Sequence, residues 1–186
     1  MSEINLGIIG GGQLGSMLSV AAKKLNIKTI IYSDDINAPA QNFSDEFIFG
    51  KFNESEKILE FINKVDKITY EFENIPYNTL MEMNKKKPVL PKPSVNRLIQ
   101  HRLAEKDFVN KLNIRTTQYT LVEKKSDLDS LNDLLPGILK TTTMGYDGKG
   151  QYPIKEIKDI DSLKIDFSKG YILEKLVKLK KEISVI

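Results

Sequence analysis

The sequence contains no cysteine, which excludes disulfides, thiolate catalysis and cysteine-ligated zinc. It has one histidine, His101, which we interpret as a surface residue without a metal role. No apolar run approaches the roughly 18 residues that a membrane span needs, and no basic leader precedes the first strand pattern. These absences exclude several classes of protein and favour a cytoplasmic location without membrane contact.

Neither basic nor acidic residues are in large excess. The 28 basic and 25 acidic residues are interspersed and leave a net charge of +3. No basic run carries interleaved aromatic residues, and Lys85–Lys87 fits the C-terminal end of a helix, where lysine is favourable. The sequence therefore predicts no nucleic-acid partner.

The first half alternates between strand and helix patterns, which predicts a Rossmann-like α/β domain with a parallel sheet over residues 1–93. Helices between successive strands of this length imply right-handed crossovers. The predicted strands are 4–9, 28–32, 46–49 and 67–72, and the predicted helices are 13–25, 54–65 and 76–86.

The second half, residues 94–186, has a different pattern. A proline-rich connector at 87–93, with room for one short strand, precedes it, and Ser94 can cap the helix that follows. We predict helices at 102–112 and 126–134, and strands at 118–122, 137–140, 151–154 and 171–176. Residues 182–186 form a further strand pattern with no closing element after it, so we expect the chain to be cut short within a domain.

The most informative segment runs from Lys140 to Gln151. An apolar strand pattern ends at Lys140, and a loop containing Gly145, Gly148 and Gly150 follows. Glycine lets backbone N–H groups turn toward an anion, and lysine adds a mobile positive charge. The segment does not fit the P-loop pattern. It predicts a loop that closes over a nucleotide triphosphate, although Asp147-Gly148 is also typical of a simple hairpin turn.

A second glycine motif lies near the N-terminus. Gly10, Gly12 and Gly15 satisfy G-x-G-x-x-G between a strand and a helix, and Asp34 follows about 20 residues further on, where dinucleotide folds place an acid for the ribose. The same glycines also suit any parallel strand that turns directly into a helix, because glycine permits the tight turn and close contact between helix and strand. Binding of NAD, of another phosphate such as a ribonucleotide's 5′-phosphate, and a purely structural role all stay open here.

The segment Thr69-Tyr70-Glu71-Phe72-Glu73-Asn74 ends a predicted sheet strand. Alternation places Tyr70 and Phe72 on one face and both carboxylates on the other. One carboxylate at the carboxyl end of a sheet strand could accept hydrogen bonds from sugar hydroxyls or an amine. A solvated strand end is the alternative.

Read together, the segments IIGGGQLGSML, TYEFENI, RLAEKDFVNKL, ILKTTTMGYDGKGQ and ILEKLVKLKKEISVI resemble, in the same order, the 5-(carboxyamino)imidazole ribonucleotide synthases. These are ligases of the ATP-grasp superfamily that act in purine biosynthesis. The resemblance covers essentially the whole chain and implies a pre-ATP-grasp domain followed by an incomplete α+β ATP-grasp domain. The implied reaction joins ATP, bicarbonate and 5-aminoimidazole ribonucleotide through carboxyphosphate, giving the carboxyamino product, ADP and phosphate.

The resemblance also implies a set of site residues. Tyr146, Asp147 and Lys149 lie where the family brings substrate and carboxylating intermediate together. Gly12, Gln13, Leu14 and Glu73 would border the aminoimidazole ribonucleotide. The implied ATP-binding residues are Arg102, Lys140, Gly145, Tyr146, Asp147, Gly148, Lys149, Gly150 and Gln151 at the phosphates, Glu174, Lys175, Leu176 and Val177 at the adenine, and Glu182 at the ribose.

Two departures from the family pattern lead to expectations. Met144 stands where many members carry a further glycine, which could alter closure of the loop. The magnesium-binding acidic residues are expected beyond Ile186, so we predict no metal ligand within the chain and little or no turnover by it alone. Another ATP-grasp ligase, or a non-catalytic nucleotide-binding fragment that needs a partner chain, are the alternatives; the resemblance further implies a homodimer.

Overall fold

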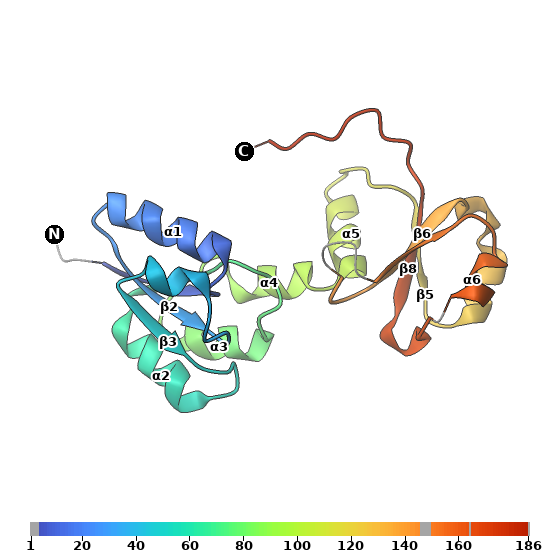
Figure 1. The fold of residues 1–186 in the computed structure, drawn as a ribbon. Helices are drawn as coiled ribbons and strands as arrows, with labels where there is room; N and C mark the ends of the chain where they lie inside the picture. Colours follow the sequence, from blue (N-terminus) through green and yellow to red (C-terminus); the bar gives the residue numbers. More distant parts are fainter. Residues whose placement is uncertain (1–3, 146–149, 164, 186) are drawn as a thin grey trace. The chain divides into compact units, whose positions relative to one another are not determined.

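The computed structural model describes residues 4–145, 150–163 and 165–185 of the chain. It divides into two compact units, Met1–Leu98 and Ile99–Ile186, each with its own sheet (Figure 1). None of the helices in these described ranges is long and apolar enough to cross a membrane.

The first unit is built on a parallel sheet with the strand order β3-β2-β1-β4. A helix between the first two strands and another between the last two agree with the predicted alternation of strands and helices. The strands are β1 (Asn5–Ile9), β2 (Lys28–Ser33), β3 (Glu46–Phe49) and β4 (Lys67–Tyr70), and the helices are α1 (Gln13–Lys24), η1 (Pro39–Asn42), α2 (Ser55–Lys64), α3 (Tyr77–Lys86) and α4 (Pro93–Ile99).

Both faces of this sheet are buried, as its unbroken apolar strands require. Ile8 pairs with Ile31 on one face, while Ile9 and Tyr32 point to the other and pack on the apolar face of α2, including Phe61. Figure 1 shows α1 and α2 on opposite sides of the sheet. The connector after α3 adds one bridge, between Ile68 and Val89, in place of a full strand.

The second unit is built on an antiparallel sheet with the strand order β5-β8-β6-β7. One face carries an apolar core that includes Leu139, Tyr171 and Leu173. The opposite face carries Lys140 and Glu174. The elements are α5 (Arg102–Lys111), β5 (Tyr119–Val122), η2 (Lys125–Ser130), η3 (Asn132–Leu134), β6 (Gly137–Thr141), β7 (Gln151–Ile154), α6 (Asp159–Ser162), η4 (Phe167–Lys169) and β8 (Tyr171–Lys175).

Three predictions about local structure are wrong. Ser94 lies inside α4 and does not cap it, because the helix already begins at Pro93, a residue suited to a first turn. The predicted helix at 126–134 is two short 3₁₀ segments, η2 and η3. Residues 182–185 form no strand, because β propensity depends on a pairing partner and the described residues offer this segment none.

Candidate nucleotide site

The glycine-rich segment after Lys140 connects β6 to β7, which pairs with β6 in the antiparallel direction. Lys140 pairs with Gln151, and Thr141 N–H donates to the carbonyl of Gly150 at 2.9 Å. Gly150 has a φ of +67°, and a Cβ there would lie 2.6 Å from Thr141 Oγ1. Only glycine fits this position without displacement. Residues 146–149, and with them the predicted roles of Tyr146, Asp147, Gly148 and Lys149, lie outside the described residues.

Met144 adopts the left-handed conformation, with a φ of +56°, and its side chain is exposed. A non-glycine residue pays about 1 kcal/mol or more for this backbone conformation. The position therefore suits glycine better than methionine.

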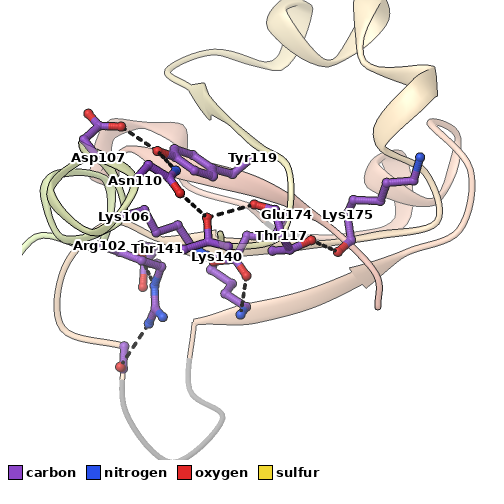
Figure 2. Close-up of polar contacts among 12 residues, drawn as sticks. Arg102, Lys106, Asp107, Asn110, Thr117, Tyr119, Lys140, Thr141, Glu174 and Lys175 are labelled. Atoms are coloured by element: carbon purple, nitrogen blue, oxygen red, sulfur yellow. Dashed lines mark hydrogen bonds and ion pairs between the residues drawn. The ribbon is translucent and has the colours of Figure 1, made fainter. Parts of the chain in front are cut away.

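Arg102 binds the backbone at the end of β6 and at the start of the loop that follows it. Its backbone N–H donates to the carbonyl of Thr142 at 2.8 Å, and its guanidinium donates to the carbonyls of Thr141 at 3.2 Å and Gly145 at 3.3 Å (Figure 2). All three acceptors are neutral. The positive charge of Arg102 at the root of the loop is therefore not cancelled by any of them.

Lys140 and Glu174 form a buried ion pair on the sheet face opposite the core. The Lys140 Nζ atom lies 2.8 Å from Glu174 Oε2, and the Glu174 side chain is only 8% exposed. A third residue completes the cluster: Lys106 Nζ, from α5, lies 3.3 Å from Glu174 Oε1 (Figure 2). Two lysines thus share one carboxylate, and the cluster has an excess of one positive charge.

Lys106 is a residue that the sequence reasoning missed. Its position four residues after Arg102 on a predicted helix was the available signal, because residues spaced i and i+4 lie on the same helical face. The ring of Tyr119 lies 5.3 Å from Lys106 Nζ and contributes a cation–π contact.

The predicted adenine segment begins in β8 and continues beyond it. The Glu174 side chain is buried against the two lysines, whereas the backbone of Lys175 and Leu176 is already bonded: Lys175 N–H donates to Gln118 and Leu176 N–H donates to Pro136, both at 2.9 Å. The N–H of Val177 donates to none of the described residues, and Val177 as a residue is half exposed. Glu182 lies on the exposed irregular segment that follows β8.

In the first unit, the N-terminus of α1 is occupied by a side chain of the protein itself. Glu71, just after β4, accepts hydrogen bonds from Gly12 N–H at 2.6 Å and from Gly15 N–H. A helix N-terminus with free N–H groups is an anion site. Here the anion is the carboxylate of Glu71, so a dinucleotide phosphate cannot use these two amides while Glu71 remains in place.

A cavity of about 170 Å³ adjoins this loop. Its lining includes Glu71 together with Asp34 and Asp35, at the end of β2, so its polar side chains are mainly acidic. Three carboxylates disfavour a phosphate and favour groups that donate hydrogen bonds. Gln13 and Leu14 are exposed in the first turn of α1.

The two carboxylates of the TYEFEN segment are separated by the fold. The strand ends at Tyr70, two residues earlier than predicted, although Tyr70 and Phe72 both pack on the first core as alternation implied. Glu71 lines the cavity, whereas Glu73 Oε1 accepts a hydrogen bond from the side chain of Asn74 at 3.2 Å. The sequence reasoning selected Glu73 for the substrate set and left out Glu71.

The described residues bring no three His, Asp or Glu side chains together in a group that could hold a metal ion. His101 has a structural role as the N-cap of α5, where its Nδ1 atom accepts a hydrogen bond from Ala104 N–H at 3.4 Å. The chemistry that the described residues of the nucleotide site supply is binding and charge neutralisation.

Comparison with known proteins identifies both units. A model of the ribonucleotide synthetase preATP-grasp domain matches residues 1–100, and a model of the ATP-grasp domain matches residues 107–186. The chain is 34% identical to the N5-carboxyaminoimidazole ribonucleotide synthase of Brucella melitensis, over 97% of this chain and 51% of that protein. The chain spans about half the length of such curated relatives.

Solved structures give the same result. The N5-carboxyaminoimidazole synthetase of Staphylococcus aureus, complexed with ADP, superposes with a TM-score of 0.89 at 32% identity, covering 95% of this chain and 48% of that one. The Aspergillus clavatus N5-carboxyaminoimidazole synthase, in complex with ADP and 5-aminoimidazole ribonucleotide, superposes with a TM-score of 0.83 at 25% identity, covering 96% and 48%. The chain belongs to the ribonucleotide synthetase preATP-grasp family, with an ATP-grasp domain following, and its relatives are N5-carboxyaminoimidazole ribonucleotide synthases.

Proposed function

We propose that this chain supplies the nucleotide-phosphate site of an ATP-dependent ligase that carboxylates 5-aminoimidazole ribonucleotide. One observation carries the proposal: among the described residues, Lys140 and Lys106 share the one carboxylate of Glu174, and Arg102 donates to the backbone carbonyl of Thr141 at the root of the same hairpin. This excess of positive charge is suited to a polyphosphate. The solved relatives that were complexed with ADP or ATP support the nucleotide.

The proposed reaction has two steps. A bicarbonate oxygen attacks the γ-phosphorus of ATP and ADP leaves, which forms carboxyphosphate. The amine of 5-aminoimidazole ribonucleotide then attacks the carboxyl carbon, phosphate leaves, and the amine loses a proton. Phosphoryl transfer depends mainly on positioning and charge neutralisation, so Lys140 and Arg102 would stabilise the charge that develops on the transferred group. Magnesium, when bound by groups outside the described residues, would add to this neutralisation.

The other predicted site residues enter the proposal with the roles that the family resemblance gives them. The Val177 N–H, which donates to none of the described residues, suits adenine. Glu182 would bind the nucleotide ribose, and Asp147 would hold the substrate amine or take its proton. The first turn of α1, with Gln13 and Leu14, and Glu73 would border the aminoimidazole ribonucleotide. A homodimer and a cytoplasmic location belong to the same proposal.

Isothermal titration of the chain with ADP tests the phosphate site. Lys140→Met should weaken ADP binding by about 10- to 100-fold, since it removes a charge-assisted contact to the phosphates. Lys155→Met, which alters an exposed lysine just after β7, is the matched control and should bind as the wild type does. Equal affinity of the Lys140 variant and the wild type would refute the assignment.

Turnover tests the reaction class. Release of phosphate that requires both bicarbonate and 5-aminoimidazole ribonucleotide would support the proposed carboxylation. Release that requires a different amine would favour another ATP-grasp ligase. ADP binding without turnover would favour the nucleotide-binding fragment that needs a partner chain.

A further inference from the structure

Glu174 has two ion-pair partners where one would neutralise it. Lys140 Nζ lies 2.8 Å from Oε2 with hydrogen-bond geometry, and Lys106 Nζ lies 3.3 Å from Oε1. The Oε1 atom is buried and accepts no hydrogen bond from the residues that the structure describes, so the contact with Lys106 is an ion pair without hydrogen-bond geometry. The arrangement leaves Lys106 able to tighten its contact with Glu174.

Binding of Lys140 to a nucleotide phosphate would remove one cation from Glu174, and Lys106 is the cation that can remain. If Lys140 turns toward a nucleotide phosphate, Oε2 loses its hydrogen-bonded partner. Leaving a buried carboxylate uncompensated costs several kcal/mol. That cost would be subtracted from the binding free energy of the nucleotide unless another cation stays with Glu174.

The Tyr119 ring holds the Lys106 side chain beside Glu174. Its Nζ atom lies over the Tyr119 ring, and the Tyr119 hydroxyl donates to Asp107 at 2.7 Å and accepts from Asn110 at 2.9 Å. Both of these residues lie on α5, the helix that carries Lys106 (Figure 2). The ring is therefore fixed to the same helix, and the Lys106 side chain, 16% exposed, is confined between the ring and the carboxylate.

We propose that Lys106 is a positioning residue: it keeps the Glu174 charge compensated and thereby frees Lys140 for the nucleotide phosphates. This inference rests on the proposed ATP binding. It assigns Lys106 no contact with the nucleotide, so its effect on affinity must pass through Glu174 and Lys140.

A double-mutant cycle with ADP as the probe tests this route. Lys106→Met should weaken ADP binding by about 10- to 100-fold in the wild-type background, and Lys106→Arg should restore most of it. In the Glu174→Gln background no buried charge needs a counter-ion, so adding Lys106→Met should change the affinity by less than about threefold. Lys111→Met, at an exposed position on the same helix, is the matched control.

The outcomes separate the inference from the function on which it rests. Wild-type protein that fails to bind ADP would refute the proposed function itself. If wild-type protein binds ADP but Lys106→Met binds as tightly as Lys111→Met, the positioning role is wrong. An equal loss in both backgrounds would mean that Lys106 contacts the phosphates directly, which also overturns the inference.

A second measurement covers the case in which Glu174→Gln itself binds too weakly. The ammonium ¹⁵N signal of Lys140 should shift when ADP is added to the wild type, because the side chain exchanges a carboxylate for phosphate. In Lys106→Met at saturating ADP the shift should be much smaller, since Lys140 must remain with Glu174. A full shift in that variant would contradict the proposal. Thermal melting of each variant verifies that it is folded.

Discussion

Replacing Glu71 should destabilise the first unit more than the loss of an ordinary surface carboxylate. Its two oxygens accept hydrogen bonds from the N–H groups of Gly12 and Gly15, at the start of α1. A hydrogen bond to a charged group contributes roughly 1.5–3 kcal/mol, and water can partly replace the carboxylate because the site is only partly buried. We therefore expect Glu71→Ala to lower the free energy of unfolding by about 2–4 kcal/mol.

Glu71→Gln removes the negative charge of the side chain but keeps its shape. The amide retains one acceptor oxygen and places an NH₂ group against the second N–H, so about 1–2 kcal/mol should be lost. Glu56→Gln is the control, because Glu56 is an exposed acid in the first turn of α2 and helps its helix mainly by charge. That contribution is typically about 0.3–1 kcal/mol.

Amide hydrogen exchange measured by NMR is the suitable assay, because two compact units need not unfold in one transition. In the Glu71→Ala variant, the amides of Gly12 and Gly15 should lose protection first, followed by a general loss across the first sheet. If these two amides exchange at the wild-type rate, or if Glu71→Ala costs no more than Glu56→Gln, the carboxylate does not hold the start of α1.

Three further predictions concern single positions. Gly150→Ala and Gly170→Ala both place a Cβ at positive φ, +67° and +65°, but only the first would approach Thr141 Oγ1 to 2.6 Å, so it should cost about 1 kcal/mol more in urea unfolding. Arg102→Lys replaces the two guanidinium nitrogens that bond the carbonyls of Thr141 and Gly145 with a single ammonium nitrogen, and it should weaken ADP binding about tenfold by titration calorimetry. Burial and two nearby carboxylates raise the pKa of Tyr32 to about 12. The contribution of its neutral hydroxyl to the free energy of unfolding is therefore complete below about pH 10 and is lost as the pH rises through 12. Tyr32→Phe should make the free energy of unfolding fall less steeply over this pH range, and an unchanged slope would contradict this prediction.

The parallel half of the fold could be predicted from the sequence because its strands are short apolar runs separated by helical patterns. The predicted strand at 46–49 agrees with β3, and the predicted helix bounds differ by one residue at one end from α1 and α3 and by one residue at each end from α2. The 126–134 segment was harder, since Leu128, Leu131 and Leu134 have a spacing that both a helix and successive 3₁₀ turns can bury.

The choice between Glu71 and Glu73 could not be made from the sequence. Both lie at the end of the same predicted strand, two residues apart, and alternation assigns them to one face. The difference arises because β4 ends at Tyr70, so the chain has already turned when it reaches Glu73. Where a strand ends depends on its neighbours in the sheet, which no local pattern contains.

The Lys140–Glu174–Lys106 cluster depends on strand register in the same way. Lys140 pairs with Ile172 across β6 and β8, and Ile138 pairs with Glu174, so the lysine and the carboxylate lie diagonally on one face. A shift of one residue in this register would move Glu174 into the apolar core. The sequence reasoning selected Lys140 and Glu174 but not Lys106, and the contact between the two selected residues depends on the register of the sheet.

The two glycine motifs therefore have different consequences even though both follow a sheet strand. In the first, Glu71 already supplies a full negative charge to Gly12 and Gly15, and the adjoining cavity adds further carboxylates. In the second, the nearby cations outnumber the single carboxylate of Glu174. Free phosphate groups should therefore be drawn to the hairpin loop and repelled from the first loop, and exchanging the local charges should reverse that preference.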